Sequence, residues 1–124
     1  MIAAARGLMA RGPSTIVITS AELSETPADE IETLAIAHEG AWRVRTPRLP
    51  ISPSGTGDLF AALLVAATVR GNDTPTALGH AASAIFAVLE CTAQAGTTEM
   101  RIVESGGVLV NPKKLFEPVA CRAD

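Results

Sequence analysis

Residues 54–60, Ser-Gly-Thr-Gly-Asp-Leu-Phe, hold the residue types in this chain that are best suited to chemistry. A Gly-rich turn at a helix start leaves backbone N–H groups unpaired, and the helix dipole favours an anion beside them. A carboxylate repels phosphate, so Asp58 fits this place if it takes a proton from a hydroxyl that attacks the phosphate. The same residues also fit a plain helix start, where Asp58 would stabilise the first turn by roughly 0.3–1 kcal/mol.

A strand is predicted in the first part of the chain. Residues 15–19 are a continuous run of β-branched side chains, which predicts a strand buried on both faces, as in a parallel sheet. Thr19 and Ser20 end that run, at the edge where open α/β sheets bind ligands. The two hydroxyls also fit a simple cap of the following turn. The Ala-rich residues 2–11 predict a helix that ends at Gly12-Pro13.

A hairpin is predicted around Glu39-Gly40, from strands at Glu32–His38 and Ala41–Thr46. In its second strand, Arg43 and Arg45 alternate with Trp42, Val44 and Thr46. The arginines could reach a nucleotide phosphate, or they could simply be solvated. Three prolines in residues 47–53 then predict a stiff, extended lead into the glycine turn.

The second half of the chain is predicted to be mainly helical. Asp58–Arg70 is strongly apolar, and Thr74-Pro75 predicts the N-cap and first position of a further helix over Thr76–Thr92. The two helices should pack as an αα-hairpin. A short strand is expected at 99–103 and a last helical turn at 113–116.

Composition limits the classes of function. The 124 residues suit one domain, 1–124, with 48% hydrophobic and 19% charged residues. A net charge of −3 without a basic block disfavours nucleic-acid binding, and the 11-residue apolar run 59–69 is too short to span a membrane. Without a secretory signal, Cys91 and Cys121 are interpreted as reduced thiols of a cytoplasmic protein.

Several segments together resemble the C-terminal part of pyridoxal kinases, which belong to the ribokinase-like superfamily of small-molecule kinases. They occur in the same order and at similar separations, over nearly the whole chain: Ile16–Ser20, Ser54–Leu64, Glu99–Ser105 and Asn111-Pro112. The Gly-X-Gly-Asp motif indicates only the superfamily. The strand ending in Thr-Ser and the Met-Arg-Ile-Val and Asn-Pro tail point to the pyridoxal branch.

The resemblance implies a partial three-layer α/β/α sandwich with a mostly parallel sheet. It also implies ATP-dependent phosphorylation of the 5′-hydroxymethyl group of pyridoxal, pyridoxine or pyridoxamine, with Mg²⁺ and optionally K⁺. Asp58 matches the base that deprotonates the substrate hydroxyl, and the anion hole corresponds to Gly55, Thr56 and Gly57. Thr19 and Ser20 match the strand end that contacts ATP phosphates or a monovalent cation. The nucleotide-lining region corresponds to Arg43, Val44, Arg45 and Thr46.

Members of that family are roughly twice as long as this chain. The N-terminal half, with most of the vitamer site and an acidic residue for Mg²⁺, is therefore expected to be missing. An apolar sheet edge should be exposed, and the full-length form is expected to be a homodimer. Two alternatives stay open. One is a hydroxymethylpyrimidine or sugar kinase of the same superfamily, and the other is a non-catalytic nucleotide-binding fragment.

Overall fold

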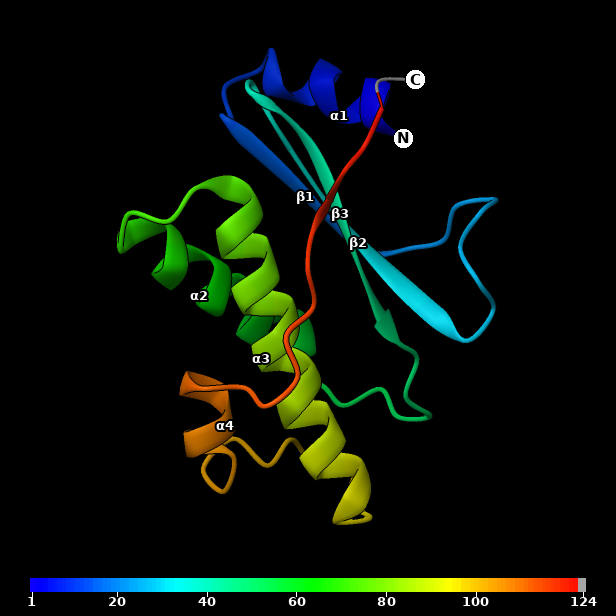
Figure 1. Cartoon of the computed structure of the whole chain (residues 1–124), viewed down its shortest axis with the longest axis vertical. Coiled ribbons are helices and arrows are strands. Elements are labelled where there is room, and N and C mark those ends of the chain that lie inside the picture. The colour runs from blue at the N-terminus through cyan, green and yellow to red at the C-terminus, as the bar shows by residue number, and fades with distance from the viewer. Residues whose placement is uncertain (123–124) are drawn as a thin grey trace.

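The computed structural model describes residues 1–122, which form four helices and four strands. Figure 1 shows the helices α2 and α3 on one side of a twisted sheet and α1 at its other side. The elements follow in the order α1 (Ile2–Met9), β1 (Thr15–Ala21), β2 (Glu30–Ala37), β3 (Gly40–Pro47), α2 (Thr56–Val69), α3 (Thr74–Gln94), α4 (Gly106–Val110) and β4 (Val119–Ala120).

The described strands form one sheet in the order β1-β2-β3-β4, and every neighbouring pair is antiparallel. The prediction of a mostly parallel sheet is therefore not confirmed. The connections explain why, because parallel neighbours need a crossover of about a dozen residues or more. Only residues 38 and 39 join β2 to β3, and residues 22–29 join β1 to β2. The hairpin itself is confirmed, with Ala37 opposite Gly40.

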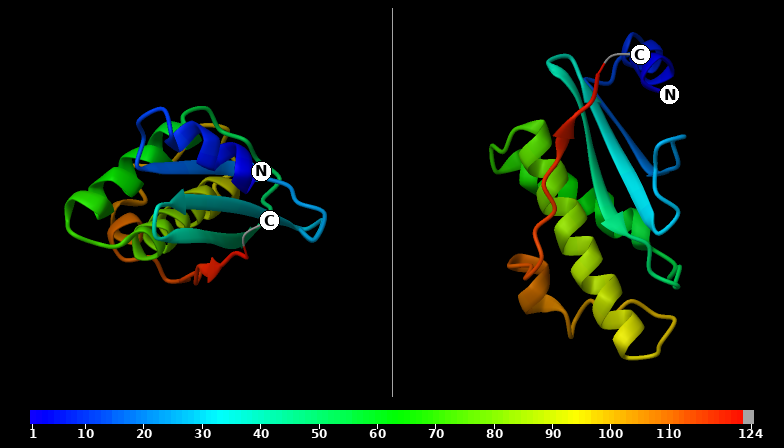
Figure 2. Two further views of the ribbon diagram at one scale, coloured as in Figure 1. Left: turned by 90° about the horizontal axis from the view of Figure 1, so that it is seen from above. Right: turned by 45° about the vertical axis from the view of Figure 1, so that its right-hand side comes forward.

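The sheet has an apolar core on each face, which accounts for the unbroken apolar run of β1. One face carries Val17, Ala35 and Val44 against α2 and α3. The opposite face carries Ile16, Ile18 and Leu34 against α1. Helices thus cover both faces of the sheet (Figure 2). Because both faces of β1 meet apolar side chains, its sequence is continuously apolar although the strand is antiparallel.

Helices α2 and α3 form the expected αα-hairpin, and Phe60 of α2 shares a core with Leu78 and Ile85 of α3. The cap of α3 is Asp73 rather than Thr74: an Oδ1 of Asp73 accepts the Thr76 N–H at 2.9 Å. By length and hydropathy alone α3 could span a membrane, but 61% of that stretch is buried inside the protein. Such burial is typical of the central helix of a folded core.

Two predictions for the C-terminal region were wrong. Residues 99–103 form no strand, because the N–H of Arg101 donates to the Thr92 hydroxyl at 3.1 Å and the chain turns there. The last helix is α4 at Gly106–Val110, and residues 113–116 are irregular. In that irregular stretch the Phe116 ring packs edge-on against Phe86, with ring centroids 5.0 Å apart.

Candidate active site

The glycine turn begins helix α2, as the sequence predicts. Gly55 is the N-cap residue with a φ of +86°, a left-handed conformation that suits glycine, and Asp58 lies in the first turn. The first bond of the helix runs from the Leu59 N–H to the Gly55 carbonyl at 3.0 Å. The N–H groups of residues 56–58 precede that bond, so they have no partner within the helix and are available to an anion.

Two side-chain contacts hold the turn in place. The Thr56 hydroxyl donates to the Pro53 carbonyl at 2.7 Å, which fixes the proline-rich lead against the helix start. The same hydroxyl lies 3.8 Å from the Met100 sulfur, and a Cβ on Gly55 would lie 3.3 Å from the Met100 methyl group. The role of Met100 was missed by sequence reasoning, because 44 residues separate it from Thr56.

A cleft of about 290 Å³ joins this turn to the end of β1. Its polar lining includes Thr19 and Ser20, with Thr46 from β3 and with Thr56 and Gly57 from α2. Its apolar wall comes from Leu49, Ile51, Phe60, Ile85, Phe86 and Leu89. The structure thus brings together residues that are far apart in sequence but were all predicted to bind phosphate or nucleotide. The apolar wall beside them was not predicted as part of the site.

Ser20 has an unusual backbone conformation in this cleft. Its φ is +53°, and it is the one described residue other than glycine with a positive φ. The β1–β2 ladder shifts register between Ile18 and Ala21, so the irregularity coincides with the end of regular pairing. Strained backbone of this kind is often found at binding sites.

Asp58 lies on the helix beside the cleft and is exposed. It follows Gly57, which lines the cleft, but it does not line the cleft itself. Helical spacing of three or four residues places it on one outward stripe of α2 with Ala62, Val65 and Val69. The base predicted from the sequence therefore lies at the margin of the cleft, on a helix face open to solvent.

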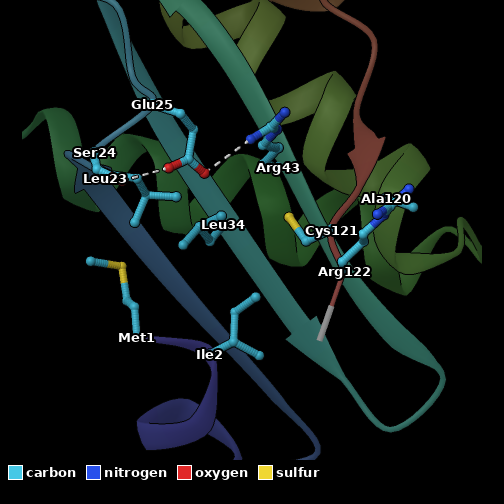
Figure 3. Close-up of a pocket in the computed structure, with 10 residues that line it drawn as sticks. All are labelled: Met1, Ile2, Leu23, Ser24, Glu25, Leu34, Arg43, Ala120, Cys121 and Arg122. Atoms are coloured by element: carbon cyan, nitrogen blue, oxygen red, sulfur yellow. Dashed lines mark hydrogen bonds and ion pairs between the residues drawn. The ribbon is translucent and has the colours of Figure 1, made fainter. Parts of the chain in front are cut away.

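The four predicted nucleotide-lining residues of β3 are divided between the faces of the sheet. Thr46 lines the cleft, whereas Val44 is buried in the core between the sheet and the helices. Arg43 lies on the opposite face, where it lines a separate cavity of about 520 Å³ with Cys121 and Arg122 (Figure 3). There it pairs with Glu25, with the guanidinium and carboxylate 3.5 Å apart.

Arg45 also has a partner on that opposite face. Its Nε donates to an Oε1 of Glu32, the residue directly across from it on β2, and this bond raises the pKa of Arg45. Glu32 is fully buried, and its second carboxylate oxygen has no hydrogen-bond partner among the described residues. This ion pair joins two strands. Sequence reasoning missed it, although opposite charges at facing positions of the predicted hairpin could have indicated it.

The described residues hold no cluster of three or more side chains of the types His, Cys, Asp and Glu that could bind a metal ion.

Comparisons with known proteins show which family the chain is similar to. Residues 1–102 match the family model described as phosphomethylpyrimidine kinase. The chain is 41% identical over 115 residues to the pyridoxal kinase PdxY of Leifsonia xyli, covering 93% of this chain and 41% of that protein. It is also 40% identical over 121 residues to the pyridoxal kinase PdxY of Deinococcus radiodurans, again covering 93% of this chain and 41% of the relative.

Solved structures show the same fold. The pyridoxal kinase of Entamoeba histolytica superposes with a TM-score of 0.81 at 22% identity, over 97% of this chain and 42% of that one. The pyridoxal kinase of Leishmania donovani in complex with ADP and pyridoxine superposes with a TM-score of 0.80 at 23% identity, over 96% and 43% of the two chains. This chain spans about two fifths of the relatives' length, and by its match over residues 1–102 it belongs to the phosphomethylpyrimidine kinase family.

Proposed function

We propose that this chain carries the phosphoryl-transfer part of an ATP-dependent kinase for the 5′-hydroxymethyl group of pyridoxal, pyridoxine or pyridoxamine. The observation that carries the proposal is the cleft that joins Thr19, Ser20 and Thr46 to the start of α2 at Thr56 and Gly57. The names of the curated relatives supply the substrate class, because those about 40% identical are pyridoxal kinases.

The two kinds of lining in the cleft suit the two ends of ATP. The free N–H groups at the start of α2 would hold the transferring phosphoryl group, with Gly55, Thr56 and Gly57 as the anion hole. The hydroxyls of Thr19 and Ser20 would contact the other phosphates. The apolar wall formed by Phe60, Ile85, Phe86 and Leu89 would receive the adenine ring. The solved Leishmania donovani relative, which holds ADP, supports nucleotide use in this fold.

Asp58 would act as the general base. An exposed carboxylate next to the anion hole can take the proton of a substrate hydroxyl as its oxygen attacks the γ-phosphorus. Mg²⁺ would supply charge neutralisation on the phosphates, and a monovalent cation such as K⁺ would lie near the end of β1. The chemistry needs positioning more than covalent steps, so a rigid helix start is a suitable platform.

A chimaera tests the assignment of Asp58. Residues of this chain replace the 115 aligned residues of the Leifsonia xyli pyridoxal kinase, and ADP release is followed with MgATP and each of the three vitamers. We expect Asp58→Asn to lower turnover by roughly 10²–10⁴-fold, the range of a positioned general base. Asp73→Asn, at the start of the next helix, is the control and should leave turnover unchanged. Equal turnover in both variants would remove Asp58 from this role.

A second candidate is phosphorylation of a hydroxymethylpyrimidine. The matching family model carries the description phosphomethylpyrimidine kinase, and a structure from Bacteroides thetaiotaomicron described as a putative enzyme of that type superposes with a TM-score of 0.83. The same chimaera should be tested with hydroxymethylpyrimidine. A higher kcat/KM for this substrate than for pyridoxal would favour the second candidate.

A further inference from the structure

The C-terminal segment, residues 113–120, crosses helix α3 on its way to the sheet (Figure 1). The helix residues that it contacts are Gly79, Ser83, Phe86 and Glu90. They are three or four positions apart, so they form one stripe along the helix. A Cβ on Gly79 would lie only 3.2 Å from the Phe116 carbonyl oxygen, so the segment packs directly against the helix there.

Phe116 makes the central contacts of this segment. Its N–H donates to the hydroxyl oxygen of Ser83, a buried residue, at 3.0 Å. Its half-buried ring meets the Phe86 ring edge-on, with the two ring planes at 75°. The Lys114 ammonium lies 5.5 Å from the centre of the Phe86 ring and pairs with Glu90 at 2.8 Å. An aromatic edge and a cation from the C-terminal segment thus hold the ring of Phe86.

Phe86 also belongs to the cleft. It is only 4% exposed, and it forms part of the apolar wall with Ile85 and Leu89. Phe116 does not line the cleft, so the Phe86 ring lies between Phe116 and the cleft. Interiors of proteins are close-packed, and a side chain that loses a neighbour moves toward the space left behind. The position of the Phe86 ring in the wall therefore depends on Phe116.

We propose that Phe116 is a positioning residue for the base of a bound nucleotide and that it acts through Phe86. The inference rests on the proposed function, because it needs ATP in this cleft with its base on the apolar wall. The phosphates would bind at Thr19, Ser20 and the start of α2, away from the Phe86 ring. Phe116 should therefore affect the binding of the base and leave the binding of the phosphates unchanged. A bound base should in turn stabilise the docked C-terminal segment, since such coupling is reciprocal.

Two ligands separate the base from the phosphates. The 124-residue chain is titrated in a calorimeter with MgATP and with magnesium tripolyphosphate, which has three phosphates and no base. Phe116→Ala should weaken MgATP binding by about three- to tenfold, the range of one aromatic contact, and should leave tripolyphosphate binding unchanged. Phe116→Leu keeps an apolar side chain against Phe86 and should recover most of the affinity. Leu115→Ala is the control, because Leu115 is 67% exposed in the same segment.

Each outcome decides between distinct failures. Equal MgATP affinities of Phe116→Ala and Leu115→Ala would overturn the inference and leave the proposed function in place. An equal loss for both ligands would also overturn it, since that indicates a general disturbance of the cleft. Tripolyphosphate binding as tight as MgATP binding in the unchanged chain would show that the wall receives no base. If neither ligand binds the unchanged chain, the inference fails together with the proposed function.

A measurement on the unchanged chain covers the case in which Phe116→Ala does not fold, which circular dichroism detects. Hydrogen exchange is followed at the Phe116 amide, whose N–H is held by Ser83. Saturating MgATP should slow this exchange more than saturating tripolyphosphate does, because only the first ligand carries a base. The same exchange rate with both ligands would overturn the coupling between the C-terminal segment and the cleft.

Discussion

At the scale of single residues, the two glycines of the turn have different tasks. Gly55 has a φ of +86° and faces the Met100 methyl group, whereas a Cβ on Gly57 would meet nothing within 4 Å. A side chain at a left-handed position costs roughly 1–2 kcal/mol. Gly55 is therefore required by the backbone of the turn, whereas no neighbouring atom requires glycine at position 57, where the proposed role is to let a phosphate approach the backbone closely.

Substitution by alanine separates these tasks. We expect Gly55→Ala to lower the free energy of unfolding by about 1–2 kcal/mol, because alanine disfavours positive φ. Gly57→Ala should leave that free energy unchanged or raise it by up to about 1 kcal/mol, since alanine is the better helix former. Urea denaturation of both variants measures the difference. A Gly57→Ala variant less stable than Gly55→Ala would show that the turn is not built as described.

At the scale of elements, the start of α3 depends on an ionised cap. The Asp73 carboxylate accepts the Thr76 N–H, and hydrogen bonding to Thr76 lowers the pKa of Asp73 below its ordinary value of 3.8. Because the pKa of Asp73 is lower in the folded protein than in the unfolded chain, the cap makes its full contribution to stability at pH values above 3.8. Its contribution is lost as the pH falls through the lower, folded value.

Replacing the cap should therefore have a pH-dependent effect. Asp73→Ala should lower the Tm at neutral pH, and its difference from the unchanged protein should shrink once the pH falls below 3.8. Asp73→Asn keeps a capping oxygen without a titrating group, so it should lose less stability at neutral pH. Thermal unfolding by circular dichroism at several pH values follows both variants. A constant deficit of Asp73→Ala at every pH would contradict an ionised cap.

Sequence patterns predicted most of these elements because the signals are local. The hairpin at Glu39-Gly40, the glycine start of α2 and the paired helices all depend on residues close in sequence. The direction of the strands and the position of Met100 depend on contacts between distant residues. The run Ile16-Val17-Ile18 is half-buried and makes apolar contacts on both faces of the sheet, which helices on either side of an antiparallel sheet provide equally well.

The candidate site was predicted only where it depends on such local signals. Thr19, Ser20, Thr46, Thr56 and Gly57 meet at the cleft, as their positions at strand and helix ends suggest. Alternation along β3 sends Arg43 and Arg45 to the other face, where acidic partners hold them. Their predicted role toward nucleotide is the part of the site that the geometry supports least.

At the scale of the whole molecule, the C-terminal segment covers one side, and the side that carries β1 and the outer face of α2 is open. The C-terminal segment crosses α3 and pairs with β3 through β4, whereas β1 and the outer face of α2 have no cover among the described residues (Figure 1). The cleft lies at the boundary of the open side. The homodimer expected for a full-length form stays a prediction.

The central claim is that ATP phosphates bind at the start of α2 and the end of β1. An NMR titration of the labelled chain with MgATP, read at backbone amides, tests it most directly. The account predicts that the largest shifts occur at residues 55–58 and at Thr19 and Ser20, and that they shrink when Mg²⁺ is removed. Shifts confined to the cavity lined by Arg43 and Cys121, or no shift at millimolar MgATP, would contradict it.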